Sequence, residues 1–141
     1  MPARAFYTGV NMKLGLVLTL FLLPLHAQPG SVERGKYLVE EVAKCGECHT
    51  PMGPDGLDRS RWMKGAVLNF QPIQPVKGWH KTAPDLTRSG RLWQKWGEAG
   101  LARFLVTGTG PSGNQAGPPM PTYKMKSEDA EAVVAYLKTL E

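Results

Sequence analysis

The stretch Cys45-Gly46-Glu47-Cys48-His49 contains the only two cysteines of a 141-residue chain. Two thiols separated by two residues and followed directly by an imidazole have the spacing C-x-x-C-H. Paired cysteines of this kind occur in three classes of site: disulfide oxidoreductases, zinc sites and covalent haem attachment sites. The remainder of the sequence helps to choose among them.

The first two classes find no further support along the chain. A disulfide oxidoreductase is expected to have a strand before its C-x-x-C motif, and no βαβ pattern surrounds Cys45. A zinc site needs four ligands, usually from two pairs, and a second cysteine pair is missing. A haem explains the spacing, because two thiols can reach the vinyl-derived carbons on one porphyrin edge while the next side chain faces the iron. We therefore expect one haem c, bound covalently through Cys45 and Cys48, with His49 as an axial ligand of the iron.

The second axial ligand separates an electron carrier from a haem enzyme or gas sensor with an open distal site. Met120 lies in Gly117-Pro118-Pro119-Met120-Pro121, where the prolines restrict the backbone and hold a loop extended. We expect its thioether to ligate the iron. Met52 follows His49 too closely to reach the opposite haem face. The other candidates are Met63, Met125 and His80.

Residues 1–27 have the pattern of a secretory signal peptide. Lys13 precedes an apolar run over residues 14–25, and the small Ala27 stands before the expected cleavage site. A run of this length is short for a hydrocarbon core of about 30 Å. We expect cleavage and export to the periplasm or beyond, with an uncleaved anchor as the alternative and Met12 as an alternative start.

The segment 28–141 has the size of one small domain. Residues 1–27 hold two basic and no acidic residues, so the rest of the chain carries 15 Lys or Arg and 12 Asp or Glu. A net charge of +3 is too mild to predict nucleic-acid binding, and the basic residues are scattered. It suits transient docking to an acidic patch on another protein.

Helical periodicity appears near both ends of this domain. Residues 31–44 and 127–140 each begin with a serine suited to capping and repeat apolar side chains at helical spacing. Gly35 lies inside the first of these helices at a cost of about 1 kcal/mol relative to Ala, which predicts close approach of another helix. We expect Tyr136 of the last helix to pack near it. A further helix is predicted over about 98–106, with a shorter one before it.

Several pieces of the sequence resemble one family. They are Arg34-Gly35-Lys36-Tyr37-Leu38, Cys45-Gly46-Glu47-Cys48-His49-Thr50-Pro51, Ala83-Pro84-Asp85-Leu86-Thr87, Phe104-Leu105-Val106-Thr107-Gly108, Pro119-Met120-Pro121-Thr122-Tyr123 and Ala132-Val133-Val134-Ala135-Tyr136-Leu137. Across about residues 32–140 the chain resembles class I cytochromes c of the bacterial periplasm. These sequence pieces are most similar to the haem domains of cytochrome subunits that accompany membrane alcohol and gluconate dehydrogenases. Those subunits usually carry several haems.

This resemblance implies an all-α cytochrome c fold, with crossed N- and C-terminal helices around a covalently bound haem. It also implies His49 and Met120 as axial ligands and electron transfer, rather than catalysis, as the activity. The expected partners are redox proteins, a dehydrogenase on one side and a terminal oxidase or other acceptor on the other. The chain would act as a monomer or as a subunit of a complex, without a membrane span in its mature part.

The proline-rich segment 51–84 departs from the shortest family members, and we expect it to form a long loop over a haem edge. A backbone carbonyl after His49 is expected to accept from its Nδ1–H, with Pro51 and Pro54 as the nearby candidates. Candidates for propionate donors or pocket walls, each also suited to plain packing, are Trp62, Trp79, Arg59, Arg61 and Tyr123.

Overall fold

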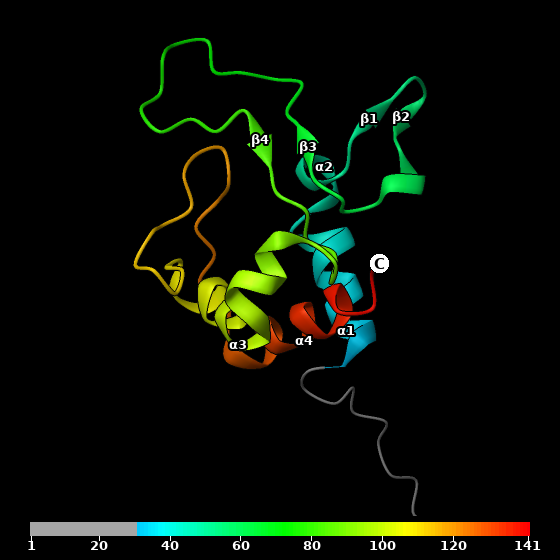
Figure 1. Cartoon of the computed structure of the whole chain (residues 1–141), viewed down its shortest axis with the longest axis vertical. Helices are drawn as coiled ribbons and strands as arrows, with labels where there is room; N and C mark the ends of the chain where they lie inside the picture. The colour runs from blue at the N-terminus through cyan, green and yellow to red at the C-terminus, as the bar shows by residue number, and fades with distance from the viewer. Residues whose placement is uncertain (1–30) are drawn as a thin grey trace, which may run out of the picture.

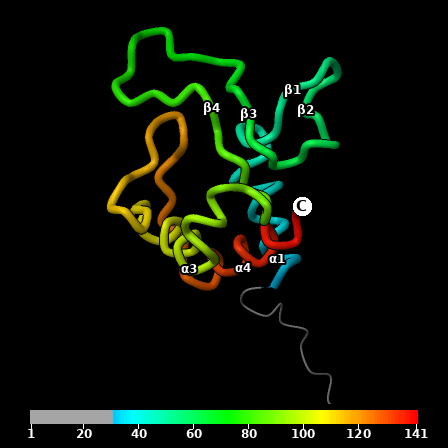
Figure 2. Tube along the Cα trace, in the orientation of Figure 1, coloured from blue at the N-terminus to red at the C-terminus, as the bar shows by residue number. Residues whose placement is uncertain are grey.

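A computed structural model describes residues 31–141, so the predicted signal peptide over residues 1–27 lies outside the described part of the chain. The first and last helices lie side by side with a third helix beside them, as Figures 1 and 2 show. The segment between β3 and β4 and the stretch before the last helix extend away from these helices. This arrangement confirms the predicted all-α fold class, with the N- and C-terminal helices in contact.

The first predicted helix is present, but it changes type halfway. Helix α1 spans Val32–Tyr37, and its N-cap Ser31 accepts a hydrogen bond from the backbone N–H of Arg34 at 3.1 Å. The chain then widens into a π-helix, η1, over Leu38–Val42. Its backbone bond from the N–H of Ala43 to the carbonyl of Leu38 spans five residues, at 2.8 Å.

Helix α1 crosses helix α4, Ser127–Leu137, at a glycine. A Cβ at position 35 would touch the carbonyl oxygen of Ala132 and lie 2.8 Å from the Cβ of Tyr136. This confirms that Gly35 is required by close approach and that Tyr136 packs near it. The predicted cap of α4 was wrong by one position, because Lys126 precedes the first helical residue and supplies no side-chain hydrogen bond.

Helix α3, Arg91–Thr107, lies against α4 and contains a break. Gly97 has φ 63° and ψ −179°, a conformation open to glycine but not to other residues without strain. The predicted helix near 98–106 and the shorter one before it are therefore both present, joined at this glycine. The C-cap Gly108, at φ 73°, ends the helix in the left-handed conformation.

Short elements fill the region from the first helix to α3. Helix α2 spans Gly46–His49, and a 3₁₀ turn, η2, spans Arg59–Arg61. Strands β1 (Met52–Gly53) and β2 (Gly56–Leu57) form one antiparallel pair, and β3 (Ala66–Val67) and β4 (Thr82–Ala83) form another. The predicted long loop over 51–84 thus holds two small hairpins that sequence reasoning did not foresee.

The hydrophobic core lies where α1, η1, α3 and α4 meet. Val39, Val133 and Met63 are among its fully or almost fully buried side chains. The indole N–H of Trp93 in α3 donates to the carbonyl of Leu86 at 2.7 Å, so its one polar atom is satisfied in the core. None of the helices within residues 31–141 has the length and apolar character that crossing a membrane requires.

Candidate haem site

Helix α2 carries the C-x-x-C-H motif on a single turn. Lys44 has φ 51°, an uncommon value for a residue other than glycine, and it turns the chain from η1 into α2. Backbone N–H groups of Cys48 and His49 then both donate to the carbonyl of Cys45, at 3.2 and 2.9 Å. Both cysteines are free thiols. A helical segment, rather than a strand, precedes the motif, which disagrees with a disulfide oxidoreductase site.

The imidazole of His49 is buried, with 4% of its surface exposed. Its Nδ1 is 2.8 Å from the carbonyl oxygen of Pro84, which fixes the tautomer with the proton on Nδ1. Burial lowers the pKa of His49, and the hydrogen bond to Pro84 opposes that effect. A neutral imidazole with Nδ1–H engaged presents the lone pair of Nε2, the form that binds a metal ion.

The prediction that Pro51 or Pro54 would accept from His49 was wrong. Pro51 instead uses its carbonyl to accept from the N–H of Asp58 at 2.8 Å, within the β1–β2 hairpin. Pro84 reaches His49 because the β3–β4 pair brings a segment 35 residues away back to α2.

The position of Pro84 is held by the turn that follows it. Oδ1 of Asp85 accepts from both the backbone N–H and the hydroxyl of Thr87, each at 2.7 Å. On the other side, the N–H of Gly65 donates to the carbonyl of His49 at 2.8 Å. A Cβ at Gly65 would lie 2.8 Å from the backbone N of Asp85, so this glycine allows the two segments to pack around the histidine. The sequence signal for this turn was the Asp-x-Thr pattern after Pro84.

The electrostatics of the two thiols also disagree with disulfide chemistry. Burial raises the pKa of Cys45 to about 11. Burial, together with the charge of Glu47, raises the pKa of Cys48 as well. Reactive cysteines of oxidoreductases have lowered pKa values, because the thiolate is the nucleophile. Two thiols on one turn of the chain, directly before a buried histidine, fit thioether attachment of haem instead.

The outer side of the motif is covered by Trp62. A Cβ at Gly46 would overlap the ring of Trp62, with three ring atoms within 3.0 Å of it. The guanidinium of Arg59 stacks over the same ring, 4.3 Å from its centroid. Next to it, the phenol of Tyr136 donates to the carboxylate of Glu40, joining α4 to η1. Trp62 and Arg59 therefore pack on the peptide between the two cysteines.

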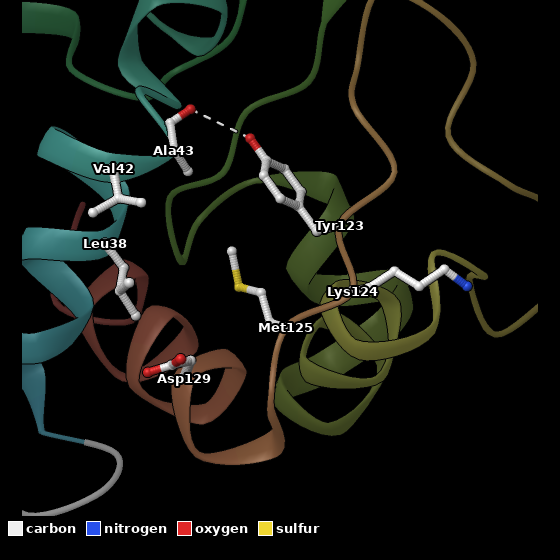
Figure 3. A pocket seen from close by; sticks show the side chains of 7 residues that line it. All are labelled: Leu38, Val42, Ala43, Tyr123, Lys124, Met125 and Asp129. Carbon is white, nitrogen blue, oxygen red and sulfur yellow. Dashed lines mark hydrogen bonds between the residues drawn. The ribbon is translucent and has the colours of Figure 1, made fainter.

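Tyr123, three residues after Met120, contacts the chain just before the motif. The phenol of Tyr123 donates to the carbonyl of Ala43 at 3.3 Å, two residues before Cys45. Tyr123 and Ala43 line a pocket of about 320 Å³ together with Leu38, Val42, Lys124, Met125 and Asp129. In Figure 3 the side chain of Met125 points into this pocket, between Leu38 and Tyr123. Met120 itself is partly buried, and its N–H donates to the carbonyl of Gly117 at 3.2 Å.

The other candidate ligands occupy different surroundings. Met63 is fully buried in the core, and its N–H donates to Oγ1 of Thr50 at 3.0 Å. Met52 is exposed on β1. His80 is exposed and packs against Gly117, with its backbone N–H donating to the carbonyl of Pro118 at 2.8 Å.

Two of the expected propionate or pocket residues have protein partners of their own. Nε of Arg61 pairs with the carboxylate of Asp58 at 2.7 Å. The hydrogen bond from Ser60, and secondly the one from Arg61, lower the pKa of Asp58 to about 2. Trp79 makes an edge-to-face contact with Phe70, at a centroid distance of 5.8 Å. Within the described segment, no three side chains of the His, Cys, Asp or Glu type gather to hold a metal ion.

The chain matches known proteins along the part that carries this site. The cytochrome c family profile covers residues 32–141. A diheme cytochrome c-type protein of Cereibacter sphaeroides is 38% identical over 112 residues, covering 75% of this chain and 34% of the relative. The fructose dehydrogenase cytochrome subunit of Gluconobacter japonicus is 29% identical over 125 residues, covering 82% of this chain and 23% of the relative. The cytochrome c subunit of a quinone alcohol dehydrogenase from Gluconobacter oxydans is 33% identical over 78 residues, covering 55% of this chain and 16% of the relative.

These matches confirm the resemblance to class I cytochromes c that accompany dehydrogenases. This chain spans about a third or less of the length of those three relatives. The family match and the two thiols beside a buried histidine agree in indicating haem c as the cofactor. The chain belongs to the cytochrome c family, and electron transfer is the activity that this membership supports.

Proposed function

We propose that this chain is an exported, single-haem carrier that passes one electron at a time from a dehydrogenase to an acceptor protein. The haem is attached through thioethers at Cys45 and Cys48, and its iron is held by His49 and Met120. The observation that carries this proposal is the buried imidazole of His49, whose Nδ1–H is engaged by Pro84 beside two free thiols. When bound, the haem supplies the one-electron couple.

The chain's own residues set the conditions for a carrier. The hydrogen bond from His49 to Pro84 fixes the ring plane and raises the basicity of Nε2. Trp62 covers Gly46, and the buried Met63 is joined to Thr50, so both limit the access of water to the 45–50 segment. Rigid surroundings of this kind keep the geometry nearly constant on reduction, which favours fast electron transfer.

Met120 is favoured over the other sulfur ligands by its surroundings. Met63 is enclosed in the core on a segment bonded to Thr50, directly after His49. Met120 lies in a loop held near the motif by the contact of Tyr123 with Ala43. Met125, two residues before the start of α4, is the remaining rival, because its side chain enters the pocket beside Tyr123.

The test compares two methionine variants in the haem-loaded protein. Met120→Ala is expected to abolish the far-red sulfur-to-iron band of the oxidised protein and to lower the reduction potential, because a thioether favours reduced iron. The matched variant Met125→Ala should keep the band. The reverse result assigns the ligand to Met125. Tight carbon monoxide binding by the reduced wild type at neutral pH would contradict methionine ligation and favour an open distal site.

Export and the number of haems are tested on the same preparation. Expression with a cytochrome c maturation system should give a haem-staining protein with one haem per chain, released in mature form from the periplasm. A chain that does not stain for haem would favour the alternative that the C-x-x-C motif belongs to a thiol oxidoreductase. A precursor that stays attached to membranes would favour the uncleaved anchor.

A further inference from the structure

The segment 67–81 forms a protruding loop with apolar side chains at its surface. Strands β3 and β4 close its base, where the N–H of Leu68 also donates to the carbonyl of Lys81 at 2.9 Å. Figure 1 shows the loop extending away from α1, α3 and α4. Ile73 is 97% exposed and Val67 is 76% exposed, with Val76 also exposed. Single exposed apolar residues are common, but several on one protruding loop are typical of an interaction surface.

The loop is stiff enough to present these side chains as a surface. Pro72 and Pro75 restrict its tip, and the edge-to-face pair of Phe70 and Trp79 braces its neck. A binding surface that is already ordered loses less conformational entropy on docking.

The charge around the loop has one sign. From residue 59 to residue 84 the chain has five basic side chains and no acidic one. The basic residues are Arg59, Arg61, Lys64, Lys77 and Lys81. Lys77 and Lys81 are both exposed within the loop itself. An apolar centre with a basic border is complementary to an apolar patch with an acidic border, and the charges would steer the encounter.

The loop also lies beside the segment that contains Met120. The N–H of His80 donates to the carbonyl of Pro118, and Gly117 leaves room for the imidazole of His80. A protein bound to the loop is therefore brought next to the 117–120 segment. A lipid surface would also accept apolar and basic side chains, but electron exchange with a protein is what makes this placement useful.

We propose that the 67–81 loop is the docking surface for a redox partner protein whose contact face is apolar with an acidic border. This rests on the proposed function, and it names the chemistry of the partner. Docking of this kind is weak and reversible, as a carrier requires, because the loop offers only a small contact area.

The test measures one-electron transfer between the haem-loaded full chain and a small blue-copper protein that has acidic residues bordering an apolar face at its copper. The proteins are mixed in the direction that their measured potentials favour. The loop variants are the pair Ile73→Ser with Val76→Ser and the pair Lys77→Glu with Lys81→Glu. The control pair is Val32→Ser with Tyr37→Ser, which removes exposed apolar groups from α1 instead.

We expect each loop pair to lower the second-order rate constant about tenfold at low salt, and the control pair to leave it within about twofold. Reduction of the haem by ascorbate should be the same in all variants, which separates docking from haem loading and ligation. Unchanged rates in both loop pairs would overturn the docking proposal while leaving the carrier function intact. A wild-type chain that takes an electron from ascorbate but not from the copper protein would overturn it too.

The membrane alternative is tested with the same variants. If the wild type sediments with phosphatidylglycerol vesicles, the loop variants do not, and the copper-protein rates are unaffected, the loop is a lipid anchor and the proposal is wrong. Absence of vesicle binding together with slowed electron transfer supports it. Loss of haem staining would instead count against the proposed function.

Discussion

Substitution of Gly35 by alanine tests how the two terminal helices cross. The added Cβ would overlap the main-chain carbonyl of Ala132 and lie 2.8 Å from the Cβ of Tyr136. Neither group can move without shifting α4. Alanine gains about 1 kcal/mol of helix propensity, but overpacking of this kind costs about 3 kcal/mol. The expected net loss is about 2 kcal/mol, which corresponds to a decrease of about 10 °C in Tm for a domain of this size.

The assay is thermal unfolding of the haem-loaded protein, followed by far-ultraviolet circular dichroism. Gly53→Ala is the matched control, because a Cβ there meets no atom closer than 3.5 Å and should change stability by less than about 0.5 kcal/mol. A Gly35→Ala protein as stable as the wild type, or more stable, would refute the close crossing of α1 and α4.

Two further predictions concern hydrogen bonds of the site. Asp85→Ala removes the acceptor that shapes the turn after Pro84 and should loosen the hydrogen bond between Pro84 and His49. The imidazole then becomes less basic, which should raise the reduction potential. Asp85→Asn keeps an oxygen acceptor and should shift the potential less, and a redox titration of both variants tests this. Burial, with the hydrogen bond to Glu40, raises the pKa of Tyr136 from 10.0 to about 12, so its stabilising effect is complete below pH 10 and is lost as pH rises toward 12. Burial also raises the pKa of Tyr123 to about 12, so Tyr136→Phe should halve the amplitude of the highest-pH step in the near-ultraviolet tyrosinate titration, and an unchanged amplitude would show that the pKa of Tyr136 is not raised.

The attachment motif and the crossing of the terminal helices were predictable because their signals are local or nearly so. Cys45, Cys48 and His49 are adjacent in sequence, and a glycine inside a helical pattern indicates a neighbour at that point. Met120 as a ligand remains a prediction, supported by its loop. The residue types at positions 45, 48, 49 and 120 led to these predictions, and no knowledge of their neighbours in space was needed.

The hydrogen-bond acceptor of His49 could not be predicted from closeness in the sequence. Its Nδ1 bonds to a carbonyl 35 residues away, and that contact depends on the β3–β4 pair, whose strands have only two residues each. Strands this short leave no alternation to read in a sequence. The contact of Trp62 with Gly46 has the same origin, because it depends on the turn at η2 rather than on the pattern around either residue.

The π-helix η1 affects the direction in which Cys45 faces relative to Gly35, because it lies between these two residues. Gly35 packs closely against α4, and Cys45 is proposed to bind the haem, while each residue of a regular helix advances the direction of the side chain by about 100°. The wide turn at Leu38–Val42 takes up an additional residue between these points. Insertion or deletion of a single residue there would therefore change the direction in which the residues after η1 face relative to Gly35, even where the apolar side chains of the core are kept.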